Sequence, residues 1–366
     1  MTRICTGAFV LLLLAAGCGE SEPSATAADP IPAFEAGPEA AEGPSRDAVL
    51  VRAQPIFGVL ALEAQSDSNP VTDAKVELGR TLYFDPRLSR NQEISCNSCH
   101  DLASFGVDGE PTSPGHGGQR GDRNSPTVYN AAFHVAQFWD GRTADVEEQA
   151  KGPILNPIEM AMGSEEDVVA VLHSIPGYEP LFRAAFPDED DPITYDNLAL
   201  AIGAFERRLV TPGRFDAFLR GETGALRDAE VEGLAVFMDT GCITCHMGPT
   251  VGGDRFQKLG AVKSYPSEDE GRFKVTDAES DRMVFKVPSL RNVAKTGPYF
   301  HDGSISTLDA AIRTMAEYQL GRTLADEEVA SIEAFLQSLT GNVNAAYVAA
   351  PELPESGPNT PPPDAS

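Results

Sequence analysis

Apolar residues recur every three or four positions in several long segments of the chain. This spacing places them on one face of a helix, whereas the alternation typical of strands is sparse. We therefore predict a mainly α fold. Some segments also carry helix start and stop signals. One predicted helix follows the capping residues Ser164 and Asp167, and another follows Ser306 and Asp309. Three more are predicted over 194–210, over 226–240 with a stop at Gly241, and from Val329 to Leu339 before Gly341.

Long connections rich in glycine and proline separate these helices, at 105–130, 247–280 and 286–304. Connections of this length without regular structure usually carry function. The proline-rich tail from Ala349 is predicted to be extended or disordered.

Composition indicates an ordinary globular protein of two domains. The 366 residues are 42% hydrophobic and 23% charged, at roughly 100–200 residues per domain. Subtracting 55 acidic from 28 basic residues gives a net charge of −27. This charge argues against nucleic acid or anionic lipid as a partner. It favours a basic partner protein or a small neutral substrate.

The N-terminus has the features of an export signal. Arg3 precedes an apolar run from Ala8 to Ala16, which is too short to span a bilayer. Cys18 follows in a lipoprotein-like context, so we expect a signal peptide over 1–17 and a lipid on Cys18; the alternative is secretion without lipid. Residues 18–46 form a predicted disordered acidic tether. The expected location is periplasmic, as a membrane-tethered lipoprotein.

Two C-x-x-C-H motifs, at 96–100 and 242–246, match the attachment pattern of c-type haem. The two thiols can reach the two vinyl groups of one haem, and the histidine supplies an axial iron ligand. A thioredoxin-like dithiol or a zinc site fits less well, because histidine follows both motifs and no βαβ pattern surrounds them. The chain is thus predicted to bind two haem c groups. The binding residues are Cys96, Cys99, His100, Cys242, Cys245 and His246.

The sixth iron ligand decides between electron transfer and peroxide chemistry. His116 lies between glycines in 114–118, so its loop could move the imidazole on and off an iron. It could equally be an exposed loop histidine. Met315 is one of several methionines that could serve the second haem, and a helical methionine is more often part of a core.

Longer strings than these motifs resemble the bacterial dihaem cytochrome c peroxidases, over nearly all of residues 70–345. These strings are SCNSCH (95–100), PTSPGHGGQ (111–119), NSPTVYNAAF (124–133), AQFWDGR (136–142), GPILNPIEMAM (152–162), GCITCH (241–246), SLRNVAKTGPYFHDGS (289–304) and QLG (319–321).

The resemblance implies two cytochrome c-like haem domains with long Gly/Pro-rich loops. The first, 47–210, would hold the peroxidatic haem of lower potential, and the tail 344–366 could return to it. The second, 211–343, would hold the electron-entry haem of higher potential.

Within the first domain, the resemblance implies that His100 is the proximal ligand and His116 a removable distal ligand. Glu159 corresponds to the acid–base residue, and Gln149 lies beside it. Without the resemblance, Glu159 could be a surface carboxylate and Gln149 a solvated helix residue.

In the second domain, His246 and Met315 correspond to the axial pair of the electron-entry haem. Trp139 corresponds to an aromatic residue between the haems, although it could be an ordinary core residue. His301 could lie next to the electron-entry haem. His134 and His173 are interpreted as structural or surface residues.

The resemblance also implies a calcium site between the domains. Asn124 and the backbone carbonyls of Thr296 and Pro298 fall on its ligand positions, and oxygen ligands suit a hard cation. Asn124 could instead be an ordinary turn or cap residue.

The implied function is reduction of hydrogen peroxide to water with electrons from a small redox protein, a basic cytochrome c or a copper protein. A homodimer is also implied. One alternative is a MauG-like enzyme that oxidises tryptophan residues of a partner protein, for which Tyr318 offers a possible iron ligand. Another is a plain electron carrier with two closed haems.

Overall fold

The computed structural model describes residue 43 and residues 45–364, and the statements below refer to these residues. The predicted signal peptide, Cys18 and most of the predicted tether lie outside them. The described chain is mainly helical, as predicted. The helices are α1 (Arg46–Ala53), α2 (Asp73–Tyr83), α3 (Cys96–Cys99), α4 (Val146–Leu155), α5 (Glu165–Ser174), α6 (Tyr178–Ala185), α7 (Tyr195–Glu206), α8 (Arg214–Leu219), α9 (Asp228–Thr240), α10 (Phe273–Thr276), α11 (Leu308–Leu320), α12 (Asp326–Ser338) and α13 (Ala345–Val348).

Most predicted helix ends agree with the structure. The Ser164 side chain caps α5 by accepting a hydrogen bond from the Asp167 amide. Gly241 ends α9 in a left-handed conformation, φ +100°, which glycine adopts without steric cost.

Three predicted ends were wrong by a few residues. Helix α7 ends at Glu206, before the predicted end at residue 210. The cap of α11 is Thr307 rather than Ser306, and its hydroxyl accepts from the Ala310 amide. Helix α12 ends at Ser338, before the predicted stop at Gly341. A Cβ on Gly341 would lie 1.9 Å from the Thr211 carbonyl oxygen, so close backbone packing requires this glycine.

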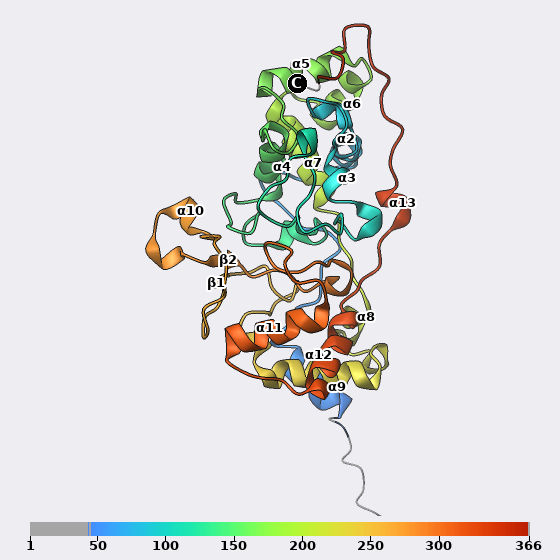
Figure 1. Ribbon diagram of the computed structural model, residues 1–366. Helices are drawn as coiled ribbons and strands as arrows, with labels where there is room; N and C mark the ends of the chain where they lie inside the picture. Colours follow the sequence, from blue (N-terminus) through green and yellow to red (C-terminus); the bar gives the residue numbers. More distant parts are fainter. Residues whose placement is uncertain (1–42, 44, 365–366) are drawn as a thin grey trace, which may run out of the picture. The chain divides into compact units, whose positions relative to one another are not determined.

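The first hydrophobic core is built mainly by α2, α4, α5, α6 and α7, and extends from Val76 to Leu209 in sequence. Helix α2 packs against both α6 and α7, and α4 packs against α7. Figure 1 shows these helices gathered in one group. The first C-x-x-C-H motif belongs to this part, because Cys96 packs against the same core.

The second core is formed chiefly by α8, α9, α11 and α12, with α9 packed on α12. Helix α1 also contributes, through Val49, Leu50 and Ala53. This packing differs from the predicted domain boundary, which places residues 47 onward with the first haem. The apolar face of α1 is buried here because it lies against α9 and α8.

A small sheet and a long excursion follow the second motif. Strands β1 (Phe256–Lys258) and β2 (Val284–Lys286) pair antiparallel, with Phe256 opposite Lys286. Helix α10 lies in the segment between them, and Figure 1 shows it next to the strand pair. The predicted structureless loop over 247–280 thus contains short regular elements.

The C-terminal tail has little regular structure, yet polar side chains from the segment 80–92 bind its backbone. Arg80 donates to the Ala349 carbonyl, Arg87 to that of Pro354 and Gln92 to that of Pro361. Tyr347 stacks on Phe205, with ring centroids 5.1 Å apart. The tail is therefore an extended, attached segment. No helix in the described part of the chain is long and apolar enough to cross a membrane.

Candidate haem sites

The second C-x-x-C-H motif opens into a largely apolar cavity. Cys242, Cys245 and His246 line this cavity together with Met315 of α11. All described cysteines are free thiols, including these two. Two free thiols, an imidazole and a thioether in one apolar cavity form the donor set of a covalently attached, six-coordinate haem. These residues therefore fit a haem c.

Local hydrogen bonding prepares His246 for iron binding. Burial lowers the pKa of His246 to about 4, so the ring is neutral at physiological pH. Its Nδ1 lies 3.4 Å from the Val251 carbonyl oxygen, which is in reach of an N–H donor. With the proton on Nδ1, the Nε2 lone pair is left for a metal, an arrangement common among metal-binding histidines.

Met315 and Tyr318, the two candidate iron ligands on α11, have different surroundings. Met315 lines the cavity with His246. The ring of Tyr318 instead packs edge-on against Tyr265, with centroids 5.2 Å apart, and beneath the Lys263 ammonium. The geometry therefore favours methionine over tyrosine as the partner of His246.

The first motif forms the short helix α3, which begins after Ser95. The Ser98 hydroxyl accepts from the Ser95 amide and so holds the first turn closed. His100 ends the helix, and its carbonyl accepts from the Tyr83 hydroxyl at 2.8 Å. Burial lowers the pKa of His100, partly offset by Asp108 and by nearby backbone groups. His100 is thus a half-buried imidazole with a lowered pKa next to two free thiols, which suits a haem ligand.

His116 and the segment around Glu159 are held together by the backbone. The His116 amide donates to the carbonyls of Ile158 and Glu159, at 2.9 and 2.8 Å. A Cβ on Gly115 would lie 2.0 Å from the Ile158 carbonyl oxygen, so only glycine permits this approach. His116 itself is buried, with 8% of its surface exposed. The structure thus brings together two residues that lie 43 positions apart in sequence.

The carboxyl group of Glu159 lies in a partly apolar environment. Burial raises its pKa, while Arg142 and a 2.9 Å hydrogen bond from the Asn156 side chain act in the opposite direction. Glu159 also acts electrostatically on Cys99, which places it near the first motif. A carboxyl group with a raised pKa is suited to proton transfer. Gln149 lies half-buried on α4, in the helix that precedes this segment.

Trp139 lies where the first half of the chain (residues 47–210) meets the second half (residues 211–343). Its indole N–H donates to the Asn124 carbonyl at 2.9 Å, and its own carbonyl accepts from the Lys286 amide. His301 lies edge-on to the indole at 6.5 Å and stacks on Phe285 at 4.5 Å. Trp139 and His301 both line the cavity of the second motif. This aromatic group therefore connects the first half of the chain to the second haem site.

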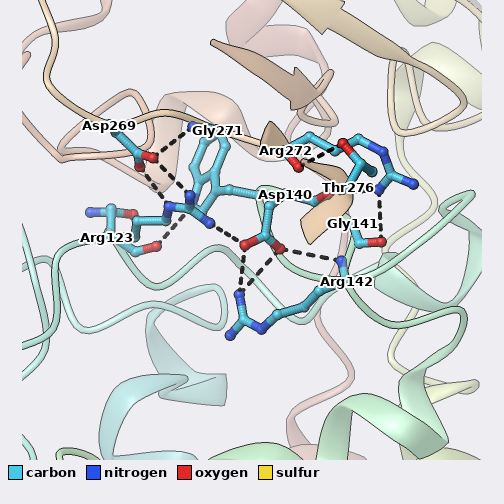
Figure 2. A network of polar contacts seen from close by, with 10 residues as sticks. Arg123, Asp140, Gly141, Arg142, Asp269, Gly271, Arg272 and Thr276 are labelled. Carbon is cyan, nitrogen blue, oxygen red and sulfur yellow. Dashed lines mark hydrogen bonds and ion pairs between the residues drawn. The ribbon is translucent and has the colours of Figure 1, made fainter. Parts of the chain in front are cut away.

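Charged residues fix the position of Trp139. Arg123 donates to Asp140 at 2.6 Å and makes a two-pronged bond with Asp269, at 2.6 and 2.8 Å (Figure 2). Arg272 donates to the Asp140 carbonyl from the other side. Arg123 precedes Asn124 in sequence, and Asp140 follows Trp139. The ion pair between Arg123 and Asp140 therefore lies next to the hydrogen bond between the Trp139 indole and the Asn124 carbonyl. Residues from both halves of the chain thus converge on this point.

The three predicted calcium ligands also line the cavity. Asn124 is buried, and its amide group donates to the Glu110 carbonyl at 3.0 Å. Its backbone N–H donates to the His301 carbonyl, which connects it to the segment of Thr296 and Pro298. Over residue 43 and residues 45–364, no cluster of three or more His, Cys, Asp or Glu side chains is arranged to hold a metal ion.

Comparison with known proteins agrees with this geometry. A family model described as di-haem cytochrome c peroxidase matches residues 73–224, and one described as cytochrome c matches residues 230–340. A cytochrome c551 peroxidase from Pseudomonas aeruginosa is 49% identical over 300 residues, which cover 80% of this chain and 86% of that protein. The chain belongs to the di-haem cytochrome c peroxidase family.

More distant members of the family include MauG proteins. The methylamine utilization protein MauG of Methylorubrum extorquens is 35% identical over 299 residues, covering 78% of this chain and 83% of that protein. The solved structure of a MauG-like protein associated with microbial copper homeostasis has a TM-score of 0.69 at 29% identity, covering 80% of this chain and 95% of that chain. The predicted family, helical fold, peroxidase class and pair of haem c groups are confirmed.

The sequence did not point to four residues near the two sites. Arg123 directly precedes the family-like string 124–133, and Arg142 is the last residue of the string 136–142. The partners of both residues become apparent only in three dimensions. Lys286 and His134 lie just outside those strings. His134 was interpreted as a structural or surface residue, but it lines the cavity of the second motif.

Proposed function

We propose that the chain reduces hydrogen peroxide to water with electrons from a small redox protein, a cytochrome c or a copper protein. The observation that carries this proposal is the contrast between the two sites. His116 and Glu159 are held together near the first motif, whereas the second motif shares an apolar cavity with Met315. The site at the first motif is suited to proton transfer, and the site at the second motif is suited to electron transfer.

When bound, each haem supplies a redox-active iron, and the first one supplies the position at which peroxide is reduced. Glu159 takes a proton from one peroxide oxygen and delivers it to the other, so that water leaves. Asn156 holds the carboxyl group in place, and Arg142 stabilises its charged form. Two electrons and two further protons complete the reduction of one peroxide to two waters.

His100 and His116 would both hold the iron of the first haem, and His116 would be the ligand that can leave. The neighbouring Gly117 and Gly118 have φ angles of +63° and +76°, which few other residues adopt. This loop can therefore change conformation without moving a helix. The loop that carries His116 would act as an order–disorder switch, biased by the redox change that a bound second haem would supply.

His246 and Met315 would hold the second haem, which would supply the entry point for electrons. A methionine ligand raises the potential relative to histidine, which would favour acceptance of an electron. Trp139 lies on the path from this cavity to the first half of the chain. The net charge of −27 favours a basic donor protein.

Asn124, with the carbonyls of Thr296 and Pro298, binds calcium between the two haem domains. These domains correspond to 47–210 and 211–343, with α1 packed in the second and the tail from 344 along the first. Calcium at this position would hold the loop of residues 296–301 against Asn124 and thereby keep Trp139 in place.

The chain works in the periplasm as a homodimer, anchored by a lipid on Cys18. The export signal and the similarity to bacterial peroxidases support the periplasmic location. The lipid anchor rests on the sequence around Cys18, and the homodimer on the family resemblance. Release of the protein from membranes after Cys18→Ala would test the anchor, and sedimentation of the calcium-loaded protein would test the dimer.

Glu159→Gln tests the proposed reaction directly. We expect peroxide turnover to fall by about 10²–10⁴-fold, the usual contribution of a general acid–base group. Both haem spectra should be unchanged. Glu148→Gln, at an exposed position of α4, is the control and should keep full activity. Near-normal turnover of the Glu159 variant would remove this residue from the mechanism.

Spectroscopy separates the proposed function from its alternatives. A Met-to-ferric charge-transfer band in the near infrared is expected for the second haem, and its absence would favour a MauG-like ligand set. A half-reduced protein that shows no high-spin iron and consumes no peroxide would instead be an electron carrier.

A further inference from the structure

Lys286 is a buried lysine without an acidic partner. It is the last residue of β2 and has only 7% of its surface exposed. Its ammonium lies 3.1 Å from Nδ1 of His134, and among the described residues no carboxylate lies within ion-pair distance of it. Burial lowers the pKa of Lys286 to about 8. A buried charge in such a position is costly unless an anion accompanies it.

The contact with Lys286 fixes the protonation of the His134 ring. An ammonium group has only donors, so Nδ1 of His134 must accept, and the ring proton must reside on Nε2. Burial, reinforced by the Lys286 charge, lowers the pKa of His134 well below its usual value, so the ring carries only this one proton. The Nε2 atom is buried and has no hydrogen-bond partner among the described residues. The Lys286 ammonium therefore keeps N–H groups that are not bonded to His134, while Nε2 of His134 lies on the opposite side of the ring.

Both side chains line the cavity of the second C-x-x-C-H motif, together with Cys242 and His246. The backbone holds them there. The Lys286 amide donates to the Trp139 carbonyl at 2.8 Å, and a Cβ on Gly253 would lie 2.3 Å from the His134 ring. Gly253 therefore leaves the space that this imidazole occupies. The pair is a built part of the cavity.

We propose that Lys286, oriented by its hydrogen bond to His134, forms a carboxylate-binding site in this cavity, which takes a propionate group of the second haem. A haem carries two carboxylates and would occupy the same cavity. One carboxylate supplies the negative charge that Lys286 lacks and accepts from the ammonium N–H groups that are not bonded to His134. The proposal depends on haem attachment, which family membership establishes, and not on peroxide as the substrate.

The two residues come from different halves of the chain. His134 lies in the part that matches the peroxidase model, and Lys286 in the part that matches the cytochrome c model. A residue of the first half therefore helps to set the potential of the haem in the second half. Removing a positive charge near a haem favours the ferric state, so the potential should fall.

Spectroelectrochemical titration of the purified holoprotein tests this site. In Lys286→Met, the one-electron reduction equilibrium of the Met-ligated haem should shift about tenfold towards the oxidised state, which corresponds to 59 mV. His134→Leu should shift it in the same direction by about threefold. Lys286→Arg keeps the charge and should stay within about twofold of the parent. The potential of the other haem should change least in every variant.

Two controls keep the result unambiguous. Haem content, measured as the pyridine haemochrome, must be two per chain. If Lys286→Met loses a haem, the potentials of Lys286→Arg and His134→Leu test the site instead.

The parent protein is also titrated in chloride and in gluconate. An unchanged potential in fully loaded Lys286→Met and His134→Leu overturns the proposal. A parent potential that depends on chloride also overturns it, because the site then binds a free anion. Loss of peroxidase activity alone would concern the proposed function and not this site.

Discussion

The two haem sites share the same five-residue motif but differ in the residues that surround it. Around the first motif, His116 and Glu159 lie on loops, and a glycine-dependent backbone contact holds them together. Around the second, residues of α9, α11 and α12 and of several connecting segments line an apolar cavity, and Met315 is one of them. Proton transfer needs a polar group that can move or titrate, whereas electron storage needs a closed, rigid environment. The motif attaches the cofactor, and the surrounding residues decide its use.

The largest expected effect concerns the buried ion pairs that stabilise each region. Arg291 and Asp216 lie in the second region, with 1% and 0% of their side chains exposed, and Arg207 and Glu147 in the first, with 7% each. Arg291→Leu or Arg207→Leu leaves a buried carboxylate without its partner. Each should lower the free energy of unfolding by about 3–5 kcal/mol. Denaturant titration followed at each haem should show that each variant weakens mainly its own region.

Arg313→Ala is the control for these ion pairs. Arg313 bonds Asp309 and Asp326 but is 40% exposed, so its removal should cost less than about 1 kcal/mol. If the buried variants were no worse than this one, the ion pairs would not distinguish the regions.

The second prediction tests the loop contact of the first site. Gly115→Ala places a methyl group against the Ile158 carbonyl and should push His116 away from Glu159. Peroxide turnover should fall by about 100-fold, the cost of a misplacement of about 1 Å, while the spectrum of the second haem stays the same. Gly121→Ala, in the same loop with no atom within 4 Å, should be active. Full activity of Gly115→Ala would show that the contact is not required.

The third prediction concerns two buried glutamates with opposite pKa shifts. In the first region, burial raises the pKa of Glu206 to about 8, with Glu147 adding to the effect. In the second, hydrogen bonds from Arg214 and Arg227 outweigh burial and lower the pKa of Glu230 to about 2. Glu206 therefore costs stability as pH rises from 4.5 through 8. Glu230 contributes stability above pH 4.5, and this is lost as pH falls towards 2.

Each glutamate can be tested by replacement with glutamine. Glu206→Gln should raise the free energy of unfolding at pH 8 by about 1–3 kcal/mol and have little effect at pH 4.5. Glu230→Gln should lower it by a similar amount at pH 7 and have less effect at pH 3. Measurements of unfolding across pH 3–8 would check both signs. A pH-independent effect of either variant would contradict the assigned shift.

The smallest expected effect concerns the tail. Tyr347 stacks on Phe205 and donates to the Phe205 carbonyl at 2.8 Å. Tyr347→Ala should destabilise the first region by about 1–2 kcal/mol, through the lost ring contact and hydrogen bond. The potential of the second haem should not change. Tyr347→Phe keeps the stacking and should lose only the hydrogen-bond part.

Helix positions followed from the sequence because their signals are local. Ser164 caps α5 through an amide three residues away, and Gly241 ends α9 by its own backbone conformation. The loop contacts were not accessible in this way. His116 and Glu159 both lie in strings that resemble the family, but nothing in the sequence shows that Gly115 permits their approach. That contact depends on a carbonyl 43 positions away.

The sequence by itself determined the two haem attachment sites, the helical fold and the family, because covalent haem binding requires a short motif and helices require a short period. Only the tertiary structure decided which side chains face each cavity. Met315 and Tyr318 lie three residues apart on one helix, yet of the two only Met315 lines the cavity with His246. Lys286 and His134 lie 152 positions apart and meet only when the halves pack. Burial and charge balance arise from that packing, so no local pattern encodes them.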